Sequence, residues 1–211
     1  VSHSISCTVK LAFGIVLQLN RMKKEVKIVL FVSGKGSNAN AVIDFSLKSK
    51  AFSVVAIYAS SPKSQALLLA KEHGLHNECI TDDDLLGRAL FERLNDQSIS
   101  LIVLAGFLRK IPVSFLNGFQ GKMINIHPSL LPEHGGAGMY GIRVHEAVIA
   151  ANEKKSGCTI HYVDQGYDTG AIIAQFSCDV MPDDTPASLA ARVLKLEHES
   201  LPKTIEQIVT P

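Results

Sequence analysis

Two stretches of the chain, residues 26–32 (VKIVLFV) and 99–105 (ISLIVLA), are almost continuously apolar and rich in β-branched residues. A strand with one face in water alternates apolar and polar side chains, whereas a strand covered on both faces is apolar at nearly every position. Runs of this length, separated by segments with helical periodicity, are typical of parallel strands with helices on both faces of the sheet. The two stretches therefore predict an α/β fold built on a parallel sheet.

The segments between these strands predict helices with recognisable ends. Ser37 or Asn38 is expected to be the N-cap of the first helix. Pro62 is expected to open a second helix that ends at Gly74, and the acidic run 82–84 to cap a third. The predicted order of the first half is strand 26–32, a helix from residue 37, strand 52–59, a helix from residue 62, helix 85–94 and strand 99–105.

The second half predicts a different sheet geometry. Two strands, 158–163 and 171–181, enclose the loop 164–170, and the last helix should begin at the Asp184-Thr185-Pro186 cap and be bent or broken at Pro202. Strand 123–126 and helix 144–152 precede them. The predicted fold class is α/β, a single domain with a mostly parallel twisted sheet flanked by helices (Rossmann-like) and an antiparallel edge in the C-terminal half.

Charge and cysteine usage exclude several classes of protein. The formal net charge is +1 over 211 residues, so neither a broad nucleic-acid surface nor a membrane surface is expected. The four cysteines form no C-x-x-C pair, and the histidines and cysteines never cluster at metal-ligand spacing, so no metal is expected. We expect reduced thiols and a cytoplasmic protein.

The first residues differ from the rest. Residues 11–17 form an apolar patch that is too short to cross a bilayer, and the charges of 21–24 follow it rather than precede it. Met22 leads directly into the first strand. We therefore expect residues 1–21 to be a non-native or disordered extension and residues 22–211 to form the domain.

A glycine-containing loop follows the first strand. The predicted strand 26–32 is connected to the next predicted helix by Gly34-x-Gly36-Ser37-Asn38. Backbone N–H groups at the start of a helix favour binding of an anion. A dinucleotide would call for a carboxylate at the end of the second strand, which instead ends Tyr58-Ala59-Ser60-Ser61. The loop predicts a phosphomonoester site, although a simple tight turn has the same residues.

Asn125, His127 and Asp168 are the candidate catalytic residues. Asn125 and His127 are two positions apart before Pro128, so they project from the same face at the rim of a strand end. A carboxamide beside a titratable imidazole could stabilise an oxyanion, and Asp168 belongs to a downstream glycine-containing loop that supplies carboxylates. Taken singly, each residue could instead be structural. His145 and His161 are expected to be structural or peripheral.

In the order and spacing of five motifs, the chain resembles the phosphoribosylglycinamide formyltransferase family from about residue 26 to residue 209. The matching segments are V-S-G-K-G-S-N (32–38), L-A-G-F-L-R (104–109), N-I-H-P-S-L-L-P (125–132), H-Y-V-D-Q-G-Y-D-T-G (161–170) and A-R-V-L-K-L-E-H (191–198). The Asn-to-Pro run alone would indicate only the wider formyltransferase superfamily. The residues 133–140 form a longer, glycine-rich version of a loop in the family.

This resemblance implies roles for individual residues. Asn125, His127 and Asp168 match the catalytic residues of the family. The match implies that Asn125 and a protonated His127 stabilise the oxyanion and that Asp168 orients His127. The residues that would bind the phosphate and the glycinamide part are Gly36, Ser37, Asn38, Arg88 and Glu197. Those that would line the folate pocket are Leu108, Arg109, Ile111, Asn125, Val163, Asp164 and Asp168.

The resemblance also implies the reaction. A formyl group would pass from 10-formyltetrahydrofolate, as co-substrate, to the amine of glycinamide ribonucleotide in purine biosynthesis, without a metal, in a monomer or homodimer. Three alternatives use similar residues. They are a hydrolase that releases formate from the same folate, a formyltransferase acting on initiator tRNA, and a non-catalytic folate- or nucleotide-binding module. The hydrolase and the tRNA enzyme would carry additional domains, and the module would not need the three catalytic residues.

Overall fold

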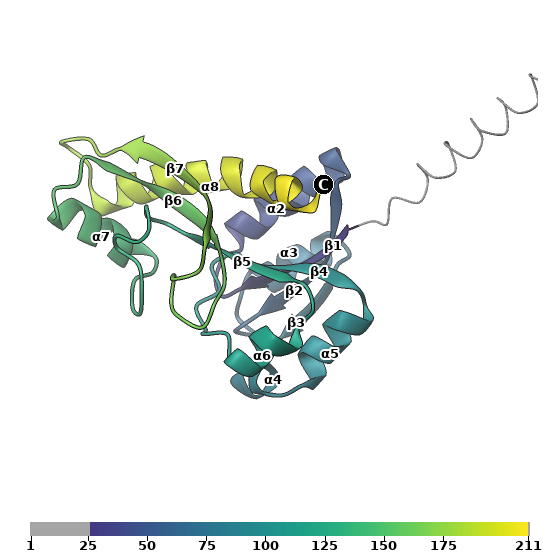
Figure 1. Cartoon of the computed structure of the whole chain (residues 1–211). Coiled ribbons are helices and arrows are strands. Elements are labelled where there is room, and N and C mark those ends of the chain that lie inside the picture. The colour runs from purple at the N-terminus through teal and green to yellow at the C-terminus, as the bar shows by residue number, and fades with distance from the viewer. Residues whose placement is uncertain (1–25, 211) are drawn as a thin grey trace, which may run out of the picture.

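The computed structural model describes residues 26–210 (Figure 1). The expected extension 1–21 and the boundary at Met22 lie outside the described residues. The strands are β1 (Val26–Val32), β2 (Phe52–Ala59), β3 (His76–Cys79), β4 (Ile99–Leu104), β5 (Lys122–His127), β6 (Lys155–Tyr162) and β7 (Ile172–Asp179). The helices are α2 (Ser37–Ser49), α3 (Ala66–Glu72), α4 (Asp82–Leu86), α5 (Ala89–Asp96), α6 (Val113–Gly118), α7 (Ile142–Ala150) and α8 (Pro186–Val209).

All seven strands form one sheet in the order β3-β2-β1-β4-β5-β6-β7. The first five strands in this order, from β3 through β2, β1 and β4 to β5, are parallel. Strand β6 pairs antiparallel with β5, and β7 pairs antiparallel with β6. The chain moves outward from β1 in one direction and from β4 in the other, so the order reverses between these two strands. In such sheets ligands bind in the crevice beyond the carboxyl ends of the strands at this reversal. The backbone N–H of Ser33 donates to the carbonyl of Gly106 there and joins the two loops (3.0 Å).

Each face of the sheet has its own hydrophobic core. Helices α2, α3 and α8 cover one face, and α4, α5 and α6 lie on the other (Figure 1). Ile28 and Leu30 of β1 are buried in the first core, and Val29 and Phe31 in the second. The β1 run is therefore apolar because both of its faces are packed against helices. This confirms the predicted fold class, including the antiparallel C-terminal strands.

Two short elements, β3 and α6, were missed. Strand β3 has the sequence HNEC, lies at the edge of the sheet and is partly exposed, so it has no apolar pattern to detect. Helix α6 also had no sequence signal that we recognised.

Several predicted helix boundaries were wrong. The N-cap of α2 is Gly36, with φ +80°, rather than Ser37 or Asn38. Pro62 lies in a turn and α3 begins only at Ala66. The predicted helix 85–94 is two helices, because Gly87 ends α4 in an extended conformation (φ −74°, ψ 173°), and glycine is a poor helix former. Thr81 caps α4. Thr185 caps α8 as expected, but this helix continues unbroken through Pro202 to Val209.

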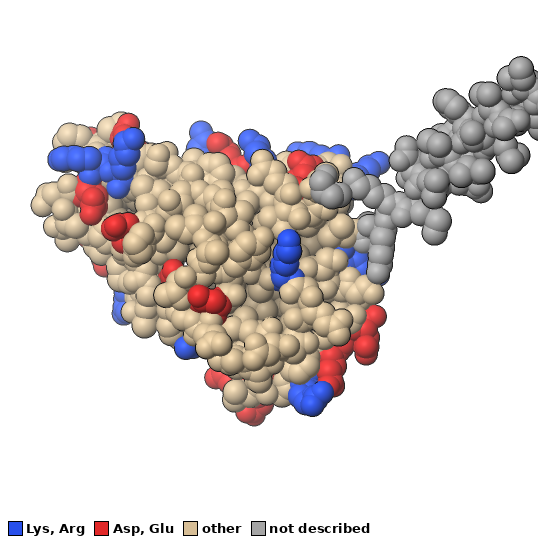
Figure 2. Space-filling view, in the orientation of Figure 1, with Lys and Arg blue, Asp and Glu red and all other residues tan. Residues whose placement is uncertain are grey.

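The described surface is mixed in charge. Basic and acidic side chains are interspersed around a broad uncharged area on the face seen in Figure 2. No helix among the described residues is both long and apolar enough to cross a membrane. No group of three or more His, Cys, Asp or Glu residues with the arrangement of a metal site occurs within residues 26–210.

Candidate active site

A cavity of about 550 Å³ lies beyond the carboxyl ends of β4 and β5. One wall comes from the loop after β4, and another from the loop between β6 and β7. The glycine-rich loop before α7 and one side of α8 complete it. The cavity thus occupies the crevice that the reversal of strand order predicts.

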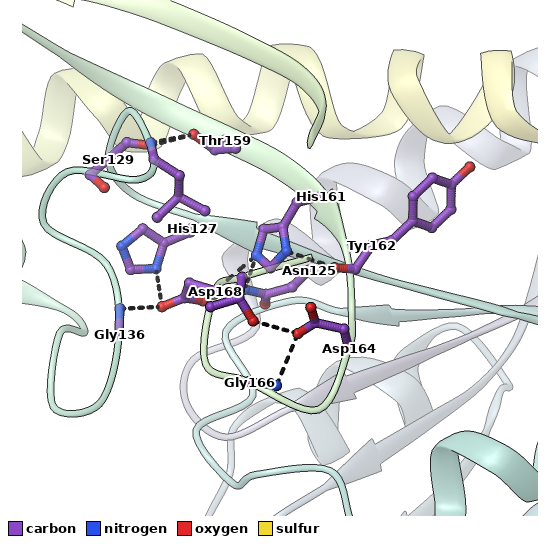
Figure 3. Close-up of polar contacts among 12 residues, drawn as sticks. Asn125, His127, Ser129, Gly136, Thr159, His161, Tyr162, Asp164, Gly166 and Asp168 are labelled. Carbon is purple, nitrogen blue, oxygen red and sulfur yellow. Dashed lines mark hydrogen bonds and ion pairs between the residues drawn. The ribbon is translucent and has the colours of Figure 1, made fainter. Parts of the chain in front are cut away.

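The structure brings the three candidate catalytic residues together at this cavity (Figure 3). Asn125 and His127 extend from the end of β5, and Asp168 comes from the β6–β7 loop with φ +58°. Asp168 Oδ2 is 3.4 Å from His127 Nδ1, and Asn125 Nδ2 donates to Asp168 Oδ1 at 3.4 Å. The expectation that His127 lies at a rim was wrong, because only 4% of it is exposed.

His161, which was expected to be structural or peripheral, is a fourth member of this cluster and is not peripheral. Antiparallel pairing of β5 and β6 places it directly opposite Asn125. Its Nδ1 lies 2.8 Å from the Tyr162 carbonyl oxygen, which can only accept, so Nδ1 carries the proton. In this tautomer Nε2 accepts from Asn125 Nδ2, 3.1 Å away. His161 therefore fixes which end of the Asn125 amide faces the cluster.

Nothing in the sequence marked His161 for this role. Its alternation with the other residues of β6 shows which face it occupies, but not which residue of β5 lies across from it. Only the register between the two strands supplies that information.

The His127 ring is held between two acceptors. Nε2 donates to the His134 carbonyl oxygen at 2.9 Å, and Nδ1 faces Asp168. Burial lowers the pKa of His127, and the Asp168 carboxylate and the His134 carbonyl offset this only in part. The neutral ring is thus favoured at pH 7, and the expected protonation of His127 during the reaction stays a prediction. The shorter contact assigns the single proton to Nε2 and leaves Nδ1 free to accept one.

Asp168 remains a carboxylate in this environment. Burial would raise its pKa, but the contact with His161, the neighbouring His127 and the N–H of Gly136 together hold the pKa below the ordinary value. The Gly136 N–H donates to Oδ2 at 3.0 Å. The glycine-rich loop 133–140 therefore holds both partners of the pair, through the carbonyl of His134 and the N–H of Gly136.

Glu197 and Asn38 meet at the far side of the cavity. Asn38 Nδ2 donates to Glu197 Oε2 at 2.8 Å, which joins the start of α2 to the middle of α8. Glu197 is 6% exposed, and burial raises its pKa to about 7 although the Asn38 hydrogen bond opposes the shift. A buried carboxylate without a cation is costly, so this position is suited to a positively charged group of a ligand.

The predicted phosphate loop surrounds the start of α2. Helix α2 has no side-chain cap and no acidic residue in its first turn, whereas α4 and α8 each begin with a capping box. Its first N–H groups are therefore not satisfied by a cap and can bind an anion. Of the predicted loop residues, Asn38 lines the cavity, while Gly36 and Ser37 lie just outside its wall.

The predicted folate residues Leu108, Arg109, Ile111, Val163 and Asp164 all line the cavity. The Arg109 guanidinium is already bound to the carbonyl oxygens of Ser60 (2.7 Å) and Ile80 (3.0 Å). Asp164 Oδ1 accepts from Gly166 N and from Thr169 Oγ1 within its own loop.

Arg88 is the one predicted site residue that the structure leaves far from this arrangement. Its side chain is exposed at the junction of α4 and α5, does not line the cavity and pairs with Glu92 (2.9 Å). His145, by contrast, was expected to be structural or peripheral, and it is buried and lines the cavity.

Comparison with known proteins gives one family. Residues 26–205 match the model of the formyl transferase family. Phosphoribosylglycinamide formyltransferase of Bacillus subtilis is 34% identical over 190 residues, which cover 87% of this chain and 94% of that protein. The chloroplastic enzyme of the same name from Vigna unguiculata is 38% identical over 189 residues, covering 86% of this chain and 60% of that protein.

Other relatives are longer, and solved structures agree with the fold. The chain spans only 14% of the trifunctional purine biosynthetic protein adenosine-3 of Drosophila melanogaster, to which it is 34% identical. The crystal structure of phosphoribosylglycinamide formyltransferase from Anaplasma phagocytophilum is 33% identical with a TM-score of 0.79, covering 88% of this chain and 87% of that one.

Proposed function

The chain belongs to the formyl transferase family, and we propose that it transfers a formyl group from 10-formyltetrahydrofolate to the primary amine of glycinamide ribonucleotide. The observation that carries this proposal is the mutual contact of Asn125, His127, His161 and Asp168 at one end of a cavity whose far side holds Glu197. One end suits the chemistry of a carbonyl, and the other suits a cationic amine. The relatives named above support the choice of substrates.

The reaction starts with attack of the amine on the formyl carbon. The carbonyl oxygen gains negative charge, and Asn125 Nδ2 can turn one N–H from its long contact with Asp168 toward that oxygen. The other N–H stays with His161, which keeps the amide in place.

The proton released by the amine needs an acceptor. His127 Nδ1 has a free lone pair directed at the Asp168 carboxylate, so the pair can take up one proton between them. The resulting imidazolium places a positive charge near the oxyanion, and the His127–Asp168 pair then gives the proton to the departing folate nitrogen. The neutral resting state of His127 thus suits a base that becomes an acid during the reaction.

The amine substrate is proposed to lie along the α2–α8 side. Its single phosphate binds the N–H groups at the start of α2, and its ammonium group lies near Glu197. Glu197, with a pKa of about 7, takes one proton from it, and the neutral amine then attacks. The folate ring system lies between the Leu108–Ile111 segment and the Val163–Asp168 loop. We also propose a monomer or homodimer in the cytoplasm, to be tested by light scattering and cell fractionation.

The test of function is a pair of assays on the same purified chain. We expect formyl transfer from 10-formyltetrahydrofolate that depends on glycinamide ribonucleotide, measured as loss of the formyl-folate together with formation of the formylated amide. Formate should not appear when the amine is absent. Rapid formate release without the amine would instead identify the hydrolase, and folate binding without either reaction would identify a binding module.

Gly36 gives a prediction for the phosphate site. It has φ +80°, and an added Cβ would lie 2.9 Å from Ala66 Cβ, so Gly36→Ala strains the loop that presents the N–H groups. We expect a KM for glycinamide ribonucleotide raised about tenfold, and a free energy of unfolding lowered by about 1–2 kcal/mol. Steady-state kinetics with each substrate varied and urea denaturation measure both effects.

The matched control is Gly34→Ala in the same loop. An added Cβ at Gly34 meets nothing within 4 Å, so this variant should resemble the unaltered protein. If Gly36→Ala raised only the KM of the formyl-folate, the two substrate regions would have to be exchanged.

A further inference from the structure

Lys110 places an uncommitted cation at the edge of the cavity. Its Nζ lies 5.2 Å from the centroid of the Tyr167 ring, in a cation–π contact that joins the loop after β4 to the β6–β7 loop. Both side chains line the cavity and both residues are exposed. No carboxylate among residues 26–210 forms an ion pair with Lys110.

The neighbouring cation, Arg109, is already bound to other groups of the protein. Arg109 is the only other lysine or arginine among the described residues that line the cavity. Its guanidinium donates to two carbonyl oxygens and lies 3.2 Å from an oxygen of Asp82. Binding a ligand anion through Arg109 would mean breaking bonds that hold the ends of β2 and β3. Lys110 has no such bonds to lose.

The co-substrate proposed above has an anionic end, for which the structure must offer a binding region. A formyl-folate consists of a pterin, a benzoyl group and a glutamate with two carboxylates at neutral pH. The reacting nitrogen must reach the buried cluster around His127, whereas burial of two unpaired carboxylates would be costly. The glutamate must therefore lie at an exposed edge. Tyr167 and Leu108, which are 44% and 55% exposed, offer apolar surface for the benzoyl group beside Lys110.

We propose that Lys110, supported by the Tyr167 ring, binds the glutamate carboxylates of the folate co-substrate and so favours glutamylated folates over carboxylate-free ones. This inference rests on the proposed function and names a specificity residue for the same site. The ring restricts the flexible lysine side chain before binding, which lowers the entropy lost on forming the ion pair. Because the pair is exposed, its strength falls as salt is added.

The test uses two co-substrates and the variant Lys110→Met, which retains an unbranched apolar side chain. We expect its KM for 10-formyltetrahydrofolate to rise roughly three- to tenfold at low ionic strength, the range of a partly exposed charged contact. The KM for 10-formyltetrahydropteroate, which lacks the glutamate, should stay unchanged, as should kcat with either compound. Raising the salt concentration should reduce the difference between the variant and the unaltered protein.

Three control variants separate this role from general effects. Lys110→Arg should keep most of the preference for the glutamate. Tyr167→Phe retains the ring and with it the cation–π contact, so it should keep the preference for the glutamate. Lys71→Met removes an exposed charge on α3, away from the cavity, and should change neither KM. Equal KM changes for both folates in Lys110→Met, or a raised KM for glycinamide ribonucleotide alone, would overturn the proposal.

Failure of the proposed function would be visible separately. If the chain transferred no formyl group, calorimetric binding of tetrahydrofolate and tetrahydropteroate would still compare the two ligands. A preference for the glutamate that disappears in Lys110→Met would uphold the Lys110 assignment and reject only the reaction. Binding of both ligands with equal affinity by the unaltered protein would reject the assignment.

Discussion

Asp168→Asn is expected to lower kcat by about 100- to 10,000-fold while the protein stays folded. The carboxylate faces His127 Nδ1, and its charge is what allows that pair to accept the proton of the amine. Asparagine has nearly the same shape, tolerates the left-handed conformation at φ +58° and can still accept the N–H of Gly136. Stopped-flow or steady-state transfer rates, together with circular dichroism, measure the two parts of this prediction.

The pH profile adds a readout that a structural role would not change. Without the carboxylate, burial acts on the pKa of His127 with less opposition, so this pKa should fall further. The acid limb of the remaining kcat profile should therefore move to lower pH.

Asp164→Asn is the matched control for this change. Asp164 belongs to the same loop and lines the cavity, but its Oδ1 accepts hydrogen bonds that an amide oxygen can also accept. We expect less than about a tenfold loss of kcat, which is below the roughly 100-fold or more that acid–base groups supply. If Asp168→Asn kept a third or more of the activity, proton transfer through His127 and Asp168 would have to be abandoned. His127→Ala is a poorer probe, because truncating a buried ring also leaves a cavity.

Glu197→Gln is expected to stabilise the protein at high pH while impairing use of the amine. The pKa of Glu197 is raised to about 7 by burial, above the ordinary value of 4.5. The folded state therefore binds more protons than the unfolded state between these two pKa values, and stability falls as the pH rises through that window. At pH 8 the full penalty, on the order of 3 kcal/mol, is present, and below pH 4.5 it is absent.

Glutamine removes the titration and keeps an acceptor for Asn38. It also supplies N–H donors, which suit the buried Asn38 Oδ1 that has no partner among the described residues. The gain in unfolding free energy should be about 3 kcal/mol larger at pH 8 than at pH 4.5. Loss of the charge should raise the KM for glycinamide ribonucleotide by about 10- to 100-fold, the value of a charged hydrogen bond.

Glu199→Gln, an exposed position on the same helix, controls for the change in net charge. Urea denaturation at the two pH values and steady-state kinetics measure both effects. A gain in stability that is independent of pH would show that the pKa of Glu197 is the same in the folded and unfolded protein. An unchanged KM would remove Glu197 from the amine site.

Much of the fold could be predicted from local sequence. The runs 26–32 and 99–105 were recognisable because strands packed on both faces need apolar residues at every position. Strand β3 and the break at Gly87 were not, because an exposed edge strand and a two-residue interruption leave no periodic signal. The cap at Gly36 was missed because its left-handed conformation depends on how the loop packs against Ala66.

The sequence by itself determined the parallel α/β architecture and the clustering of Asn125 and His127, since both follow from the period of a strand. It also indicated Asp168 and Glu197, but only through resemblance. The tertiary structure decided the rest. The register of β5 against β6 places His161 against Asn125, the loop before α7 supplies the acceptor for His127, and burial by α8 raises the pKa of Glu197. The physical reason is that hydrogen-bond partners and desolvation depend on residues far apart in the chain, which local periodicity does not encode.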